Sequence, residues 1–104
     1  MIDSERMAEL ETEIGAEDLR LILGMFMDEA TDALTGIEMD LDAEAMTRTM
    51  HFLRSGALNM GLCGFAAAAG AVEGQTCDDP VATARTLQDI LQRSREQLDI
   101  ARAA

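Results

Sequence analysis

The strongest constraint on the fold is an apolar stripe that runs through residues 17–41. Its members follow one another mainly in steps of three and four, which places their side chains on one face of an α-helix. A β-strand would instead alternate apolar and polar residues. We therefore predict a helix over about 17–40 whose stripe is buried against other helices. The stripe consists of Leu19, Ile22, Leu23, Phe26, Ala30, Ala33, Leu34, Ile37 and Leu41.

Four further segments have helical periodicity, and we predict helices at about 4–13, 43–60, 64–75 and 80–103. Ser4 and Asp42 are suitable N-cap residues. Asp79 followed by Pro80 is a typical helix start. The last two helices have inner faces formed by Phe65, Ala68, Ala69 and Val72, and by Ala84, Leu87, Leu91, Ser94, Leu98 and Ala101.

Short loops between long amphipathic helices favour antiparallel neighbours. We therefore expect residues 1–104 to form a single all-α domain, an up-down antiparallel four-helix bundle with a short N-terminal covering helix. The length is too small for two packed cores. Only 3% of the residues are aromatic and one is proline, which disfavours an all-β fold.

The charge of the chain limits its partners. The formal net charge is −12, and residues 1–44 carry 14 acidic residues against two arginines. This balance disfavours nucleic acid and anionic membranes as partners. No apolar run approaches the ~20 residues of a membrane span. A protein partner is therefore expected, with the acidic segment acting mainly as a solvated face.

Neither a disulfide framework nor a metal site is expected. Cys63 and Cys77 are 14 residues apart and form no Cys-x-x-Cys motif. On the helix of the single histidine, His51, the nearest carboxylate is Glu44. The N-terminus is acidic and lacks a signal-peptide core, so we expect a cytoplasmic protein with reduced thiols.

His51 is the residue that most directly suggests chemistry. On a helical wheel with about 100° per residue, it lies about 160° from the direction of the apolar residues of its helix. We therefore predict that it projects into water from the middle of a bundle helix. The core-facing residues of that helix are Met46, Thr49, Met50, Leu53, Ala57 and Met60.

The surroundings of His51 suit a phosphoryl group. A neutral imidazole is a good nucleophile. Arg48 and Arg54, one turn to either side, can neutralise the charge of a phosphoryl group by charge-assisted hydrogen bonds. Small Ser55 and Gly56 leave room for a large partner. A lone surface histidine is nevertheless more often only a solvated polar residue, so both interpretations stay open at this point.

The segment from His51 to Gly61, His-Phe-Leu-Arg-Ser-Gly-Ala-Leu-Asn-Met-Gly, resembles the signature of histidine-containing phosphotransfer (HPt) domains, His-x-Leu-Lys/Arg-Gly-Ser/Ala-x-x-Leu/Met-Gly. The order of the predicted helices over most of residues 17–103 is also similar to that family. One departure is that Ser55 stands where the family has glycine, with Gly56 one position later. This exchange puts partner choice and docking in question.

The resemblance implies a phosphocarrier. Such domains take a phosphoryl group from a receiver-domain aspartate and pass it to another receiver, or relay it from a hybrid histidine kinase. His51 would be the phosphoryl acceptor and Arg54 would stabilise the phosphoryl oxygens, with Arg48 as possible further support. The chain has no nucleotide-binding motif, so it is not an autonomous kinase. We expect no cofactor on this chain and Mg²⁺ on the partner receiver.

Docking of a receiver requires apolar contacts around His51. We expect Leu58 and Phe52 to supply them, and Ser55 and Gly56 to belong to the docking surface because their small size leaves room for the receiver. Leu21, Met25 and Met39 lie off the predicted stripe; we expect the first helix to cover them, although they can instead extend the docking surface. A monomer is expected. The alternative function is a helical adaptor, or an impaired HPt-like bundle, that binds signalling proteins without phosphotransfer.

Overall fold

The computed structural model describes residues 2–38, 42–73 and 79–103, and the side chains of the last range as far as Leu98. These residues form helices and contain no strand, which confirms the all-α prediction. The helices are α1 (Ser4–Ile14), α2 (Ala16–Glu38), α3 (Ala43–Asn59), α4 (Cys63–Val72) and α5 (Pro80–Ala103).

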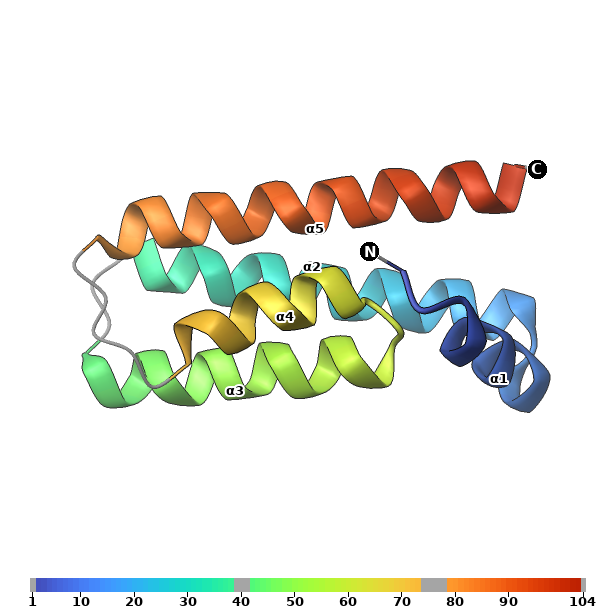
Figure 1. Cartoon of the computed structure of the whole chain (residues 1–104), viewed down its shortest axis with the longest axis horizontal. Coiled ribbons are helices and arrows are strands. Elements are labelled where there is room, and N and C mark those ends of the chain that lie inside the picture. Colours follow the sequence, from blue (N-terminus) through green and yellow to red (C-terminus); the bar gives the residue numbers. More distant parts are fainter. Residues whose placement is uncertain (1, 39–41, 74–78, 104) are drawn as a thin grey trace.

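Helices α2 to α5 alternate in direction and lie side by side, while α1 packs at one end (Figure 1). Helix α2 contacts α3 and α5, and α4 contacts the same two helices, so the four form a closed bundle. Ala66 and Ala69 on α4 are almost fully buried. Their small side chains let α4 approach its neighbours closely, which matters for the site described below.

Aspartate side chains cap three of the helices. Asp42 accepts a hydrogen bond from the Ala45 backbone N–H at 2.7 Å, and Asp79 accepts one from Ala82 at 3.1 Å. Both were predicted from the sequence. The predicted cap of the first helix was wrong: Asp3, and not Ser4, caps α1, by accepting from the Arg6 backbone N–H at 3.1 Å.

The C-terminal ends of α3 and α4 come earlier than predicted. Helix α4 ends at Val72, whereas the sequence predicted a helix to Gln75. Glu73 leaves the helix with φ −57° and ψ 126°, although its N–H still bonds to the Ala69 carbonyl at 3.1 Å. Gln75 itself, and the predicted last residues of the second helix, lie outside the described residues.

The core contains most of the residues of the predicted stripes, but on α2 one predicted residue is exposed and one residue that was not predicted is buried. Ile22 was predicted to be buried but is 37% exposed, whereas Met27 was not predicted and is 3% exposed. Leu41 and Ala101 are outside the described side chains. The buried apolar residues of the described chain are Leu10, Leu19, Leu23, Phe26, Met27, Ala30, Leu34, Ile37, Met46, Met50, Leu53, Ala57, Leu62, Phe65, Ala66, Ala69, Ala84, Leu87, Leu91 and Leu98.

Helix α1 closes the end of α3. The Arg6 guanidinium donates to the Asn59 carbonyl at 2.9 Å, and the Asp3 N–H donates to the Gly61 carbonyl at 2.8 Å. The first bond satisfies a carbonyl group that the end of α3 leaves without a helical partner, and the second ties α1 to the turn that follows α3. Because α1 packs there, it does not cover Leu21 and Met25, which are 63% and 54% exposed. The expectation that the first helix covers them was wrong; Met39 lies outside the described residues.

Two further sequence predictions can be compared with the described residues. Among them, no helix is long and apolar enough to cross a bilayer. Cys63 is a free, partly buried thiol at the start of α4. Cys77 lies outside the described part of the chain.

Candidate functional site

His51 stands in the middle of α3 with 65% of its side chain exposed, on the face that the helical wheel predicts. The opposite face of α3 is anchored by Met50, Leu53 and Ala57, none of which is exposed. Because these buried side chains fix α3 in the bundle, the imidazole projects into solvent from a rigid helix.

A carboxylate from α4 contacts the imidazole. Oε1 of Glu73 lies 2.9 Å from Nδ1 of His51, and the Glu73 side chain is only 22% exposed. Glu73 was not among the predicted partners of His51, because it belongs to a different helix. The signal was present: His51 precedes the turn at Gly61 by ten residues and Glu73 follows it by twelve. Positions at similar distances from the turn face each other in an antiparallel helix pair.

The contact with Glu73 decides which ring nitrogen can react. An ionised carboxylate only accepts hydrogen bonds, so Nδ1 of His51 carries the hydrogen in this contact. In the neutral ring the lone pair is then on Nε2, which makes Nε2 the nucleophilic nitrogen. This is the arrangement in which an acidic partner orients a histidine and stabilises the positive charge that the ring acquires when Nε2 forms a bond.

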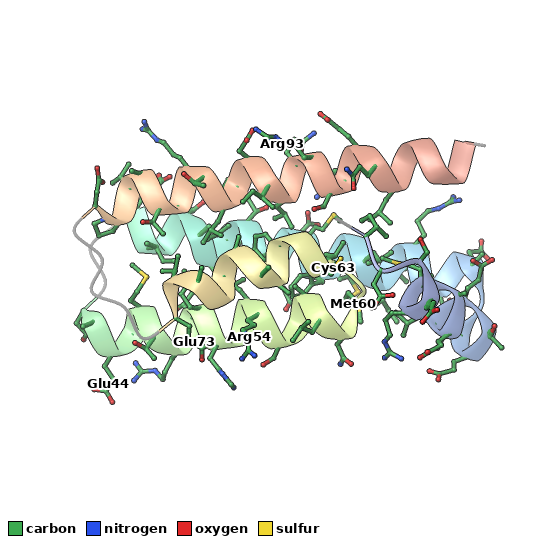
Figure 2. All side chains as sticks on the ribbon, in the orientation of Figure 1. Glu44, Arg54, Met60, Cys63, Glu73 and Arg93 are labelled. Carbon is green, nitrogen blue, oxygen red and sulfur yellow. The ribbon has the colours of Figure 1, made fainter. Side chains whose placement is uncertain are left out.

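Arg54 shares the same carboxylate. Its Nη1 lies 3.6 Å from Oε2 of Glu73, and the side chain is 46% exposed. His51 and Arg54 are one turn apart on α3, and Glu73 bridges them from α4 (Figure 2 labels Arg54 and Glu73). The predicted pair of His51 and Arg54 is therefore bridged by Glu73, a residue that was not among the predicted site residues.

Arg48, the other predicted arginine, has a different partner. Its Nη1 lies 3.4 Å from Oε1 of Glu44 on the same helix, and both side chains are strongly exposed. Exposed ion pairs of this kind are worth about 0.3–0.5 kcal/mol, so Glu44 restrains Arg48 only weakly. Arg48 borders the same hollow as His51 and is free to turn toward a charged group there.

A hollow of about 700 Å³ opens beside the imidazole, and we call it the His51 hollow. The rings of Phe26 on α2 and Phe52 on α3 form its aromatic side, with centroids 6.4 Å apart and planes inclined at 44°. It is lined by Phe26, Thr47, Arg48, His51, Phe52, Ser55, Gly56, Asn59 and Glu73. Leu58, the remaining predicted docking residue, is 51% exposed but does not line this hollow.

The exchange of serine and glycine after His51 has a physical cause. A Cβ atom on Gly56 would lie 2.3 Å from Cε1 of Phe26, a distance that real Cβ atoms do not adopt. Phe26 therefore requires glycine at position 56. Ser55 has no such restriction, because it is exposed at the border of the hollow.

The apolar surface continues from the hollow onto α2. A second hollow of about 220 Å³ shares Phe26, Gly56 and Asn59 with the first and is otherwise bordered by Ile22, Met25, Glu29 and Met60. Ile22 and Met25, which are exposed on α2, thereby extend the surface around His51. For Met25 this agrees with the less favoured of the two sequence interpretations, whereas Leu21 is exposed but borders neither hollow.

A metal centre needs several ligating side chains close together. Within the part of the chain that the structure describes, no three His, Cys, Asp or Glu side chains gather as a metal site would require. The His51–Glu73 pair itself supplies one nitrogen and one carboxylate.

Comparison with known proteins gives one finding that fits this site. Residues 21–103, which include α3, α4 and the whole His51–Arg54–Glu73 group, match the family described as Hpt domain. No curated protein and no solved structure matches the chain. The family match covers most of the sequence, and the chain belongs to the Hpt domain family.

Proposed function

We propose that this protein is a histidine phosphotransfer protein of a two-component phosphorelay that accepts a phosphoryl group on Nε2 of His51. The observation that carries the proposal is the exposed His51 ring whose Nδ1 contacts Glu73 at 2.9 Å. The family to which the chain belongs supports phosphotransfer in general terms. The donor and acceptor would be aspartates of response-regulator receiver domains, with a hybrid histidine kinase as the upstream source.

The transfer step follows from the tautomer of His51 that has its hydrogen on Nδ1 and its lone pair on Nε2. The Nε2 lone pair of His51 attacks phosphorus, the Nε2–P bond forms, and the P–O bond to the receiver aspartate breaks. The aspartate leaves as a carboxylate and takes the bonding electrons. Nδ1 keeps its hydrogen, so the phosphorylated ring is positively charged and lies against the negative Glu73. Transfer to the next receiver reverses these steps and returns a neutral imidazole.

The arginines have separate roles in this proposal. Arg54 lies one turn from His51 and can donate to the phosphoryl oxygens, whose charge is spread over three atoms in the transition state. Arg48, one turn from His51 in the other direction along α3, supports the phosphoryl group from the opposite side. The receiver supplies the aspartate and Mg²⁺. No ATP enters the reaction on this chain, which is a phosphocarrier and not an autonomous kinase.

Receiver docking uses the surface around the His51 hollow. Phe52 is 45% exposed and offers an aromatic contact. Ser55 and Gly56, which line the hollow, are small and leave room for the receiver to reach the imidazole. Leu58, two turns along α3 on the same helix face as His51, adds an apolar contact. We propose that the protein works in the cytoplasm as a monomer.

The test is transfer of label from a phosphorylated receiver domain. We expect an acid-labile, base-stable label on this chain, and its complete loss in His51→Gln. The chain has one histidine, so label of this stability reports His51 directly. Receivers that bind the chain without ever labelling it would contradict phosphotransfer and would support the alternative, an adaptor or impaired bundle that uses the same apolar surface.

A further inference from the structure

Two pairs of residues face each other across the contact between α3 and α4. His51 and Arg54 are one turn apart on α3, and Gly70 and Glu73 are one turn apart at the end of α4. Glu73 contacts both α3 residues. Figure 2 shows Arg54 and Glu73 next to each other at this contact. The role of Gly70 is the part of the arrangement that the proposed function does not yet use.

Gly70 lies under the stem of the Arg54 side chain. A Cβ atom on Gly70 would be 3.1 Å from Cδ of Arg54, 3.2 Å from Nε and 4.0 Å from Cγ. Three consecutive atoms of the arginine therefore run across a position of α4 that lacks a side chain. This course brings the guanidinium to 3.6 Å from the Glu73 carboxylate.

Glycine is an unfavourable residue at this place in a helix. Helix α4 is rich in alanine, with Ala66 to Ala69 before Gly70 and Ala71 after it. Glycine destabilises a helix interior relative to alanine because it has more backbone freedom to lose. The neighbours of a Cβ at position 70 are atoms of a partly exposed, flexible arginine, so alanine would fit after Arg54 has moved. Stability of the helix alone would therefore favour alanine.

We propose that Gly70 is a positioning residue for phosphotransfer, because the space above it holds Arg54 next to Glu73 and one turn from the acceptor nitrogen. A side chain at position 70 pushes the arginine stem away from α4 and moves its guanidinium away from Glu73. This proposal rests on the proposed function, since Arg54 acts on the phosphoryl group that His51 carries.

The proposal predicts effects of opposite sign on stability and on transfer. Gly70→Ala raises the thermal unfolding midpoint by about 5 °C, through the better helix propensity of alanine. The same variant lowers kcat for phosphoryl transfer by about tenfold, because a displaced cation no longer meets the transition-state charge. The KM for the receiver stays unchanged, since Arg54 does not serve docking. Gly70→Met, with a longer side chain, lowers kcat further.

The matched control is Gly36→Ala on α2. A Cβ there meets no atom within 4 Å, so this variant gains stability and keeps the kcat of the unmodified protein. A second control places Gly70→Ala in an Arg54→Ala background. If Gly70 acts through Arg54, the substitution causes no further loss of kcat in that background.

The results separate the two proposals. If the unmodified protein takes no label, the proposed function fails, whatever Gly70 does. If it takes label and Gly70→Ala transfers as fast as Gly36→Ala, the positioning role is overturned. A tenfold loss that persists in the Arg54→Ala background also overturns it, because Gly70 then acts through some other group. The Arg54 Nε–H resonance in NMR spectra should shift in Gly70→Ala and remain in place in Gly36→Ala.

Discussion

Oε1 of Glu73 lies 2.9 Å from Nδ1 of His51, although 22 residues separate the two in the chain. The other oxygen of the same carboxylate lies 3.6 Å from Nη1 of Arg54. One acidic side chain from the end of α4 therefore contacts both His51 and Arg54 on α3. This relationship makes the site a product of the contact between two helices and not of the His51 motif alone.

Replacing Glu73 by glutamine tests the role of this carboxylate. Glutamine keeps an acceptor oxygen but loses the charge that stabilises the positively charged, phosphorylated ring, and charge-assisted hydrogen bonds are about twice as strong as neutral ones. We expect Glu73→Gln to slow phosphorylation of His51 about five- to tenfold. Rapid-quench transfer from a labelled receiver measures the rate, and ¹⁵N spectra of the imidazole report a more mixed tautomer population.

Glu44→Gln is the control for that measurement. Glu44 is on α3 and pairs with Arg48, so this variant removes an equal charge without touching the His51 ring. We expect its transfer rate to stay within about twofold of the unmodified protein, because exposed ion pairs contribute little. Equal losses in both variants would mean that only net charge matters, against a specific role for Glu73.

The two arginines should differ in their effect. Arg54 lies against Glu73 next to the acceptor ring, whereas Arg48 is more exposed and pairs with Glu44. We expect Arg54→Ala to lower kcat for transfer by about tenfold or more, and Arg48→Ala by no more than about threefold. Steady-state transfer with one receiver measures both. Equal losses would show that Arg48 binds the phosphoryl group as strongly as Arg54 does.

Local sequence signals predicted the local features of this fold well. The caps at Asp42 and Asp79, and the outward direction of His51, follow from residue type and helical period within one or two turns of chain. The prediction that Ser4 caps the first helix was wrong because the neighbouring Asp3 is an equally good cap residue. The bonds that Asp3 and Arg6 make near the end of α3 favour Asp3 as the cap.

Features that depend on packing between helices could not be predicted in the same way. Ile22 and Met27 lie at opposite edges of the α2 stripe, and the positions of the neighbouring helices decide which edge is covered. Glu73 was missed for a similar reason, since its contact with His51 depends on the register between α3 and α4. The requirement for glycine at position 56 appears only once Phe26 is placed against α3.

Charged substitutions on the apolar surface should weaken receiver docking. Leu58 and Met25 are both about half exposed, at 51% and 54%, and lie on α3 and α2. We expect Leu58→Glu and Met25→Glu each to raise the KM for the receiver about tenfold, because a charge must then be desolvated in the interface. Titrations of transfer rate against receiver concentration measure this effect.

Gln92→Glu is a matched control for docking, because it adds the same charge at an exposed position of α5. Its KM should stay near that of the unmodified protein. Unchanged kinetics in Leu58→Glu would remove Leu58 from the docking surface. An effect in Met25→Glu alone would place the partner over the α2 side of His51.

Gly56 should be intolerant of even one added methyl group. The Cβ of alanine at this position would lie 2.3 Å from Cε1 of Phe26, whose ring is 8% exposed and packed in the core. Overpacking of this kind costs about 1–3 kcal/mol, which exceeds the gain of up to about 1 kcal/mol from replacing glycine in a helix. We therefore expect Gly56→Ala to lower the free energy of unfolding, measured by urea denaturation.

The same substitution in a Phe26→Leu background provides the decisive comparison. A leucine at position 26 leaves space for the new methyl group, so Gly56→Ala should be neutral or stabilising there, and the two changes should be strongly non-additive. Gly24→Ala, where a Cβ meets no atom within 4 Å, should stabilise the protein in either background. If Gly56→Ala destabilises equally with Phe26 and with Leu at position 26, then Phe26 is not what excludes a side chain from position 56. The glycine that follows Ser55 would then need a different explanation, such as direct contact with the receiver.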